Sequence, residues 1–545
     1  AVNHKTSNLT ACHLSTSALE SQVAKFWEVE ELTNKAVLSE EDLATEQYFL
    51  ESYSRQKNGR FTVSLPFKNN KVSLGNSREV AEKRFYNLKR KLNNQVEIKS
   101  EYVKFLKEYE ELGHMQLVPE QELNKADCCY LPHHPVIKNA AVTTKLRVVF
   151  DASSKSANCQ SLNDNLLEGP NLQQELVCIL MRFRLYKYVF CGDIEKMYRQ
   201  ISLKKRDTEY QRILWASSLD NEVRVYRLNT VTYGTSSAPY LAMRCLKQLA
   251  LENQHLFPVA CAHILNDFYM DDLLCGHDSL LEAVELQTQI VQILKQGQFN
   301  LYKWSSNDPA LIPLTSNQNQ NTIEYNNSED KKTLGLIWNS TEDKLKYNIK
   351  MEPSISNFTK RSILSVIAQI FDPLGLISPL VVKAKIIMQQ LWQIKLSWDE
   401  KIPLELQERW VKYLEELTQL NIITIPRSVI INYLVEIVEL HGFADASMQA
   451  YGAAIYVRSV DINGRCNVSL LCAKSRIAPL KTHSLPRLEL LGAVLLSKLV
   501  DKTLNSLNLT VKHCYLWTDS TIVLNWLSAS PNTWQVFVAN RVSEI

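Results

Sequence analysis

Two groups of acidic residues in this 545-residue sequence have the types and spacing of metal-dependent phosphoryl-transfer sites. In the first group, Asp193 follows the apolar run 186–191, and Asp271 and Asp272 lie in the apolar segment 263–275. Carboxylates at strand ends and in hairpin turns project from a rigid sheet, so two neighbouring strands can present them to the same ions. Phosphoryl transfer uses two metal ions about 4 Å apart, and hard oxygen ligands favour Mg²⁺, with Mn²⁺ as an alternative. A lone Asp pair is more often an ordinary turn, but the second strand-end aspartate favours a metal site.

The second group consists of Asp445, Glu489 and Asp519. We expect Asp445 and Asp519 to end strands. Glu489 is placed on a helix that begins near Ser484, with Pro486 in its first turn. Each residue alone would be an ordinary surface or capping acid. Together, on strand, helix and strand, they can converge on one pair of metal ions.

The elements that must position these residues differ along the chain. Ser39 followed by acids predicts a helix start, and residues 78–92 form a basic helix around an apolar stripe. That helix is either a nucleic-acid face or, more commonly, a solvated surface. Residues 135–138 and 146–150 predict a hairpin, and 263–275 predicts two short strands around a tight turn.

The second half of the chain is predicted to begin with helices and to end in a mixed domain. After Gly335 the pattern is mostly helical through Leu420, with large tryptophan anchors. From Val435 strands alternate, and helix, strand and helix follow to the end. The short segment 194–201, directly after Asp193, is also predicted to be helical.

Composition excludes several classes of protein. The chain has 61 basic and 58 acidic residues, a net charge of +3, so any nucleic-acid contact must come from local patches. Its 12 cysteines form no CxxC pair, which favours reduced thiols over a zinc or disulfide scaffold. No apolar run reaches the roughly 18 residues of a membrane span, and the N-terminus has no secretory pattern. The length predicts roughly three to four domains.

Several motifs together resemble reverse transcriptases. Segment 269–272 resembles their active-site hairpin, 193–198 their first metal-binding motif, and 233–239 the template- and nucleotide-supporting motif between them. Segments 131–135, 147–153 and 371–376 resemble the BEL/Pao group of LTR retrotransposon polyproteins, and the resemblance covers nearly the whole chain. It implies an α+β multidomain protein: a right-hand polymerase of fingers, palm and thumb, a helical connection, and an RNase H-like α/β domain.

The resemblance implies four domains. Residues 1–125 would be a mostly helical post-protease segment with the start of the fingers, and 126–340 the fingers and palm. Residues 341–432 would be the helical thumb and connection. Residues 433–545 would be the RNase H-like domain.

The resemblance also assigns roles to single residues in the polymerase. Asp193 and Asp271 would be the principal metal ligands, with Asp272 assisting them. The nucleotide-binding residues would include Tyr198, as the steric gate against a 2′-hydroxyl, and Arg147, which would clasp the triphosphate. They also include Lys138 on the facing strand and the pair Tyr233 and Gly234.

Asp445, Glu489 and Asp519 match three of the four catalytic carboxylates of the family's RNase H domain. No Asp occurs in the 26 residues after Asp519, so the domain is expected to be truncated and hybrid cleavage impaired. Truncation is also expected to expose part of the helix around 488–499. The missing initiator Met, protease signature and integrase predict the middle of a longer polyprotein.

The implied function is an RNA-directed DNA polymerase of a retrotransposon, linked to a ribonuclease for RNA–DNA hybrids. The alternative is a non-catalytic or domesticated nucleic-acid-binding module. An RNA-dependent RNA polymerase is disfavoured by Tyr198 and the RNase H-like segment. Expected partners are an RNA or DNA template with primer, RNA–DNA hybrid, dNTPs and the protease, integrase and Gag-like products, with no membrane. The expected location is the cytoplasm, in virus-like particles.

Overall fold

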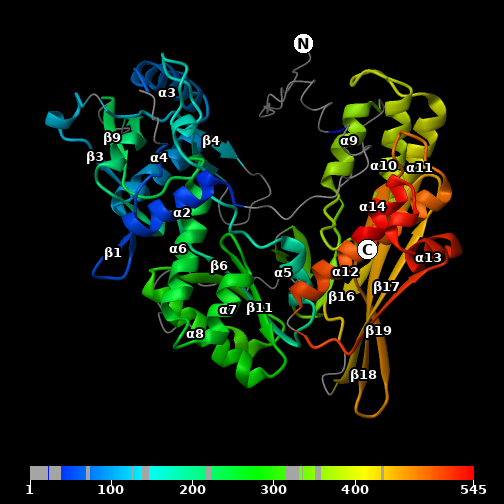
Figure 1. Ribbon diagram of the computed structural model, residues 1–545. Coiled ribbons are helices and arrows are strands. Elements are labelled where there is room, and N and C mark those ends of the chain that lie inside the picture. Colours follow the sequence, from blue (N-terminus) through cyan, green and yellow to red (C-terminus); the bar gives the residue numbers. More distant parts are fainter. Residues whose placement is uncertain are drawn as a thin grey trace. The chain divides into compact units, whose positions relative to one another are not determined.

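The computed structural model describes most of the chain (Figure 1). The described residues are Val23, 38–68, 74–125, 127–137, 146–216, 222–313, 331–333, 335–349, 358–430, 435–507 and 509–545. The chain divides into two compact units. We call Lys35–Glu175 with Tyr188–Tyr325 the N-terminal unit, and Leu176–Lys187 with Asn326–Ile545 and Ala1–Asn34 the C-terminal unit.

A four-stranded antiparallel sheet organises the N-terminal unit. Its strand order is β10-β11-β6-β12, with the bounds Phe268–Tyr269, Asp272–His277, Tyr188–Ile194 and Leu301–Ser306. Helices α6 (Ala238–Asn253), α7 (Pro258–Asn266) and α8 (Leu280–Gln296) pack against one another beside this sheet (Figure 1). Helix α8 buries apolar side chains at helical spacing, and it contacts β6 and β11.

Smaller elements complete the N-terminal unit. Helices α2 (Glu40–Ser52), α3 (Arg78–Asn93) and α4 (Val96–Glu111) accompany a sheet of order β1-β2-β7 and another of order β3-β9-β8. The predicted hairpin is present as the antiparallel pair of β4 (His133–Ile137) and β5 (Leu146–Phe150). The bounds of the other strands are Ser54–Arg55 (β1), Phe61–Val63 (β2), Met115–Leu117 (β3), Ser202–Leu203 (β7), Arg212–Trp215 (β8) and Arg224–Leu228 (β9).

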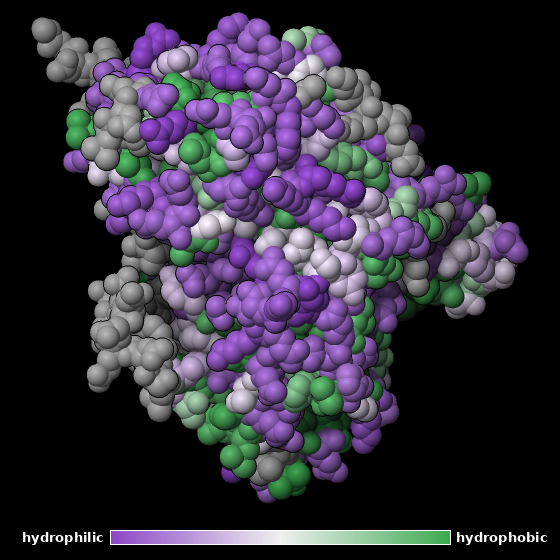
Figure 2. Space-filling model, turned by 90° about the vertical axis from the view of Figure 1, so that its left-hand side faces the viewer, coloured by the Kyte–Doolittle hydropathy of each residue, from purple (hydrophilic) through white to green (hydrophobic). Residues whose placement is uncertain are grey.

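Local signals in the first hundred residues are confirmed. Ser39 caps α2 in a capping box with Asp42. Helix α3 buries its apolar stripe and leaves its basic side chains at the surface, where Arg84 pairs with Asp151 at 2.8 Å. The face of the molecule drawn in Figure 2 is mainly hydrophilic, with separate apolar areas between the polar ones.

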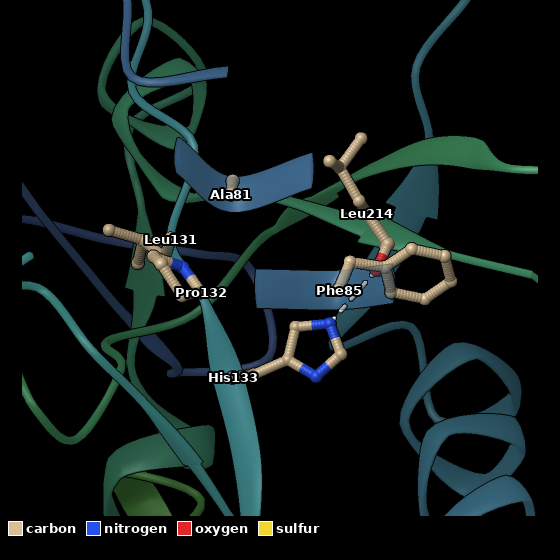
Figure 3. Close-up of a pocket in the computed structure, with 6 residues that line it drawn as sticks. All are labelled: Ala81, Phe85, Leu131, Pro132, His133 and Leu214. Atoms are coloured by element: carbon tan, nitrogen blue, oxygen red, sulfur yellow. Dashed lines mark hydrogen bonds between the residues drawn. The ribbon is translucent and has the colours of Figure 1, made fainter. Parts of the chain in front are cut away.

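A small apolar hollow beneath the β4–β5 hairpin contains His133 (Figure 3). The hollow is lined by Ala81, Phe85, Leu131, Pro132, His133 and Leu214. The His133 imidazole is hydrogen-bonded through Nε2 to the Leu214 carbonyl at 2.9 Å and through Nδ1 to the Tyr102 hydroxyl. Burial lowers the pKa of His133 to about 4, so this ring is a neutral core residue near pH 7.

The C-terminal unit combines a small sheet with helices. Its strands have the order β13-β14-β15-β16 and the bounds Lys331–Thr333, Leu336–Asn339, Lys344–Lys346 and Thr424–Pro426. Helices α9 (Lys360–Gln369), α10 (Ser378–Gln393) and α11 (Leu404–Thr418) share one core, in which Trp398 and Trp410 are buried. Helix α5 (Leu176–Phe183) belongs to the same unit and contacts α12.

A second four-stranded sheet follows in the C-terminal unit (Figure 1). Strands β17 (Val435–Ala446), β18 (Ala450–Asp461) and β19 (Cys466–Ile477) are antiparallel, and β20 (His513–Thr518) runs parallel to β17. Helix α12 (Leu485–Ser506) packs on β17 and β18 and contacts the short helices α13 (Thr521–Ser528) and α14 (Val536–Glu544). The predicted order of strands, helix, strand and helix is confirmed.

Four local predictions are wrong. His263 lies on α7 rather than on a strand, because Pro258 starts a helix that buries Ala260, Cys261 and Ile264 at helical spacing. Residues 194–201 contain only a 3-10 turn, Met197–Gln200, and the stretch after Gly335 begins with β14 and β15 before its helices.

The fourth concerns α12, whose apolar side chains between Leu488 and Leu499 are buried instead of partly exposed. Exposed apolar side chains on the neighbouring sheet include Phe443, Tyr515 and Trp517.

Among the described residues, no helix combines the length and apolar character needed to cross a membrane.

Candidate active sites

The turn between β10 and β11 brings the first group of aspartates together. Strand β11 pairs with β6 so that Asp272 stands directly opposite Asp193. Asp271 lies in the turn itself, where Met270 has a φ of +56°. The Asp271 carbonyl accepts a hydrogen bond from the Ile194 amide at 2.8 Å. The tight turn and the cross-strand bond place Asp193 and Asp271 at one end of the sheet, as the sequence predicts.

The two carboxylates interact electrostatically. The Asp271 side chain is open to solvent at the turn, but the surrounding chain partly desolvates its carboxylate, and this burial together with the charge of Asp193 raises its pKa. Lys303 on β12 lowers that pKa and forms an ion pair with Asp193, with Nζ 2.8 Å from Oδ2. A pair of oxygen donors whose charges repel is chemically suited to a hard divalent cation.

An aromatic residue covers one side of this end of the sheet. Tyr198, in the 3-10 turn after β6, is half-buried, and burial together with the nearby Asp271 charge raises its pKa to about 12. The ring therefore stays un-ionised near neutral pH. Its centroid lies 6.5 Å from that of Tyr233, in an edge-on arrangement.

The backbone at Gly234 approaches β5 closely. Gly234 has a φ of +104°, and an added Cβ would lie 2.1 Å from the carbonyl oxygen of Phe150. The Tyr233 hydroxyl donates a hydrogen bond of 2.6 Å to the carbonyl of Val148, which also lies on β5. These contacts require glycine at position 234 and connect the 233–239 motif to the hairpin.

Arg147 also lies on β5, where its side chain is exposed. Its charge lowers the pKa of Tyr233, although burial of that hydroxyl raises the pKa overall. Arg147 and Tyr233 are thus neighbours in space, as the nucleotide-site hypothesis requires. Lys138 lies outside the described residues.

The second carboxylate group converges as predicted. Asp445 at the end of β17, Glu489 on α12 and Asp519 after β20 each offer an oxygen, and these atoms lie within 4.8 Å of one another. Glu489 is 8% exposed, and its Oε2 has no hydrogen-bond partner within the described part of the chain. Burial and the charges of Asp445 and Asp519 raise the pKa of Glu489. A buried oxygen without a partner beside two other carboxylates fits a divalent cation site.

Two family models match the chain. Residues 137–303 match reverse transcriptase (RNA-dependent DNA polymerase), and residues 359–520 match the Pao retrotransposon-like RNaseH-like domain. The chain therefore carries a reverse transcriptase domain followed by a Pao retrotransposon-like RNaseH-like domain. The first match contains the Asp193 and Asp271 site, and the second contains Asp445, Glu489 and Asp519.

One solved structure that is similar is the foamy viral protease-reverse transcriptase in complex with double-stranded DNA. The sequence identity is 14% and the TM-score is 0.44. The alignment covers 76% of this chain, which spans 62% of the length of that relative. A comparison with curated proteins finds no significant match.

The match of residues 137–303 to reverse transcriptase indicates the general chemistry of that domain. Reverse transcriptases use divalent metal ions and bind nucleic acid, and both carboxylate groups supply suitable oxygen donors. The two carboxylate groups differ in how close their donor atoms lie to one another. Among the described residues, the set Asp445, Glu489 and Asp519 has all its donor atoms within 4.8 Å, whereas Asp193, Asp271 and Asp272 do not form such a set.

Two polar residues that support the reverse transcriptase site were not predicted from the sequence. Gln173 holds β10 and the start of the β10–β11 turn, because its Nε2 donates to the Phe268 carbonyl at 2.9 Å and its Oε1 accepts from the Met270 amide at 2.8 Å. Asn163 holds the 233–239 motif, with bonds to the Gly234 carbonyl at 3.0 Å and the Ser236 amide at 2.9 Å. Both act across long sequence separations, so no local pattern marks them.

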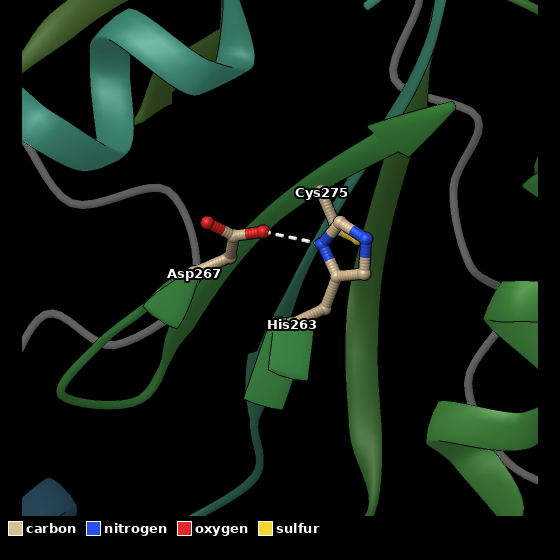
Figure 4. Close-up of side chains that lie close together, drawn as sticks. All are labelled: His263, Asp267 and Cys275. Atoms are coloured by element: carbon tan, nitrogen blue, oxygen red, sulfur yellow. Dashed lines mark hydrogen bonds and ion pairs between the residues drawn. The ribbon is translucent and has the colours of Figure 1, made fainter. Parts of the chain in front are cut away.

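A buried polar cluster supports the same hairpin from behind (Figure 4). His263 on α7 pairs through Nδ1 with the Asp267 carboxylate at 2.5 Å, and Cys275 on β11 lies beside the ring. Burial alone would lower the pKa of His263, but the Cys275 sulfur and the Asp267 carboxylate raise it to about 11. The cluster ties α7, the helix before the hairpin, to β11, the second strand of the hairpin.

Proposed function

We propose that this chain is a retrotransposon RNA-directed DNA polymerase that copies RNA into DNA with Mg²⁺, and that its second domain cleaves RNA–DNA hybrids. The observation that carries the proposal is the placement of Asp193 and Asp271 at one sheet end, next to Tyr198 and the Tyr233–Gly234 motif. No single one of these residues specifies a polymerase, whereas their common location matches the requirements of nucleotidyl transfer.

In this proposal, Asp193, Asp271 and Asp272 hold the divalent ions. When bound, such ions would supply activation of the primer 3′-hydroxyl and stabilisation of the charge on the leaving oxygen. The chain supplies the geometry: β6 and β11 fix the two carboxylates, and Gln173 fixes the turn between them. Mn²⁺ has the same preference for oxygen ligands and is expected to substitute for Mg²⁺.

The nucleotide would be recognised by residues around the same sheet end. The un-ionised ring of Tyr198 would lie beneath the sugar and leave no room for a 2′-hydroxyl. Arg147 presents an exposed guanidinium from β5, and this group forms forked hydrogen bonds with phosphate oxygens. Lys138 is proposed to assist from the facing strand, on the family resemblance alone.

The RNase H-like domain would act on the RNA strand of hybrids through Asp445, Glu489 and Asp519. One donor atom of each residue lies within 4.8 Å of the other two, and a bound cation would offset the charge of the buried Glu489 carboxylate, whose Oε2 has no hydrogen-bond partner among the described residues.

The wider context rests on the Pao family resemblance. We propose that the partners are an RNA or DNA template with primer, dNTPs and RNA–DNA hybrid, together with protease, integrase and Gag-like products of the same polyprotein. The proposed location is the cytoplasm, within virus-like particles. The alternative function, a non-catalytic nucleic-acid-binding module, predicts binding of template–primer without extension.

A primer-extension assay tests the proposal. The purified chain is incubated with poly(rA)/oligo(dT), dTTP and Mg²⁺, with Mn²⁺ and EDTA in parallel. Extension that depends on the metal is expected. Binding of the template–primer without any extension, in either metal, would support the non-catalytic alternative instead.

A further inference from the structure

Lys303 forms an ion pair with a residue of the polymerase metal site. Its Nζ lies 2.8 Å from Asp193 Oδ2, and its charge also acts on Asp271. The ammonium group lies 4.8 Å from the centroid of the Tyr302 ring, on the same strand. A cationic side chain therefore already engages one of the two carboxylates that the proposed function assigns to divalent ions.

The backbone around Lys303 departs from a regular strand. In the pairing of β12 with β6, Tyr302 stands opposite Asp193 and Ser305 stands opposite Cys191, so the register shifts between them. Lys303 and Trp304 together face Gly192, and Lys303 has a φ of +54°. A positive φ is uncommon for a lysine, and bulges beside active sites redirect side chains. The bulge is the local feature that accompanies the contact between Lys303 and Asp193.

The other lysine near this strand end is directed elsewhere. Lys196, three residues after Asp193, pairs with Glu108 at 2.6 Å and with Glu195 at 3.6 Å. Lys303 is half-buried, with 39% of its side chain exposed, and Asp193 is 23% exposed. The Lys303–Asp193 pair can therefore open towards solvent without unfolding the sheet.

We propose that Lys303 is a resident counter-cation, which holds Asp193 in the metal-free protein and leaves it when a divalent ion binds. The inference rests on the proposed metal site. Without the ion, Lys303 offsets the repulsion between Asp193 and Asp271 and stabilises the hairpin. With the ion, Nζ must give up the Asp193 oxygen, because the oxygen becomes a metal ligand. Lys303 is thus a positioning residue that competes with the metal.

Competition predicts two effects of opposite sign when the charge is removed. Metal binding should become tighter, because Asp193 no longer has to release a cation. The metal-free protein should become less stable, because two neighbouring carboxylates lose their counter-charge. If Lys303 had a purely structural role, its removal would lower both the metal affinity and the stability of the protein.

The experiment measures Mn²⁺ binding to the protein without nucleic acid, from the EPR signal of free Mn²⁺. The second carboxylate group is removed in all samples with Asp445→Asn and Glu489→Gln, so that binding reports the polymerase site. Three variants are compared with that background: Lys303→Met, the charge-preserving Lys303→Arg, and the exposed control Lys295→Met on α8. Lys303→Gln serves in place of Lys303→Met if the latter does not fold.

We expect Lys303→Met to lower the Mn²⁺ dissociation constant by about fivefold or more. This is the effect expected when one positive charge is removed from contact with a carboxylate at a solvated site. Its thermal midpoint in EDTA should fall by a few degrees, and Mn²⁺ should restore it. The Mn²⁺ dissociation constants and thermal midpoints of Lys303→Arg and Lys295→Met should stay close to those of the background protein. Equal or weaker Mn²⁺ binding by Lys303→Met, or by Lys303→Gln where it is used instead, would overturn the inference.

The result separates this inference from the proposed function. If Asp271→Asn abolishes Mn²⁺ binding while Lys303→Met leaves the affinity unchanged, the metal site stands and the counter-cation role is wrong. If the background protein binds no Mn²⁺, both the metal site in the absence of nucleic acid and the displacement of Lys303 are wrong. Primer extension by that same protein would then still decide the polymerase function.

Discussion

At the level of single residues, the polymerase site depends on two carboxylates whose charges repel each other. Burial and the Asp193 charge raise the pKa of Asp271, and Lys303 lowers it. A divalent cation relieves this repulsion more fully than a lysine does, because it has two charges and can contact both oxygens. The same argument predicts how the site responds to loss of either ligand.

Asp193→Asn or Asp271→Asn is expected to slow primer extension at least about 10³-fold, because each removes a ligand that holds transition-state charge. Template–primer affinity should change little, since contacts to the nucleic-acid backbone dominate it. Glu97→Gln, at an exposed position on α4, is the matched control. Near-normal extension by Asp271→Asn would show that the metal ligands are elsewhere.

Tyr198 is expected to determine the choice of sugar. Tyr198→Val removes the ring and should admit ribonucleotides, while deoxynucleotide incorporation is largely kept. Tyr198→Phe keeps the ring and should keep the discrimination, because the hydroxyl is not required for exclusion by volume. The measurement is the ratio of ribo- to deoxynucleotide incorporation on one template. An unchanged ratio in Tyr198→Val assigns the gate to another residue.

At the level of elements, the β10–β11 hairpin is held from several directions. Gln173 bonds to its turn, and the His263–Asp267 pair joins α7 to the strand that carries Cys275. The contacts of β12 reach Asp193 through Lys303. The position of Asp193 and Asp271 therefore depends on packing around the strands as much as on the hairpin itself.

The His263 cluster predicts a pH dependence of stability. The folded pKa is raised to about 11 from 6.5, so the stabilisation is complete below the unfolded value and is lost as the pH rises towards 11. We expect the apparent stability advantage of the wild type over His263→Gln/Asp267→Asn to be larger at about pH 6 than at about pH 9. Urea unfolding at the two pH values measures it. An advantage that grows with pH would mean that the buried histidine is neutral.

At the level of the whole molecule, the two carboxylate groups belong to different compact units. Asp193 and Asp271 lie in the N-terminal unit, and Asp445, Glu489 and Asp519 lie in the C-terminal unit. Each group is completed within its own unit, by β6 and β11 in one and by β17, α12 and β20 in the other. Loss of one metal site should therefore leave the other chemistry intact.

Glu489→Gln is expected to abolish whatever hybrid cleavage the chain performs and to leave primer extension within about twofold of wild type, as substitutions at separate sites act independently. Asp271→Asn should give the reverse pattern. Both activities are measured on the same preparations, with a labelled RNA–DNA hybrid and a primed template. Parallel loss of both activities in Glu489→Gln would show that the two units depend on each other.

The amino-acid sequence determined the chemistry of this protein and the elements that carry it. Asp193, Asp271, Asp445, Glu489 and Asp519 can be placed at strand ends, in a turn and on a helix from local spacing alone. Strand and helix signals are local, because they depend on side-chain periodicity and capping over a few residues.

Only the tertiary structure decided which distant residues support those sites. The bulge that accompanies the contact between Lys303 and Asp193 and the bonds of Gln173 and Asn163 have no signal in their own neighbourhood. Each arises from contacts between segments far apart in the chain: β12 with β6, for example, or residue 163 with the 233–239 motif. Such contacts are set by how whole elements pack, and the local sequence does not encode that packing.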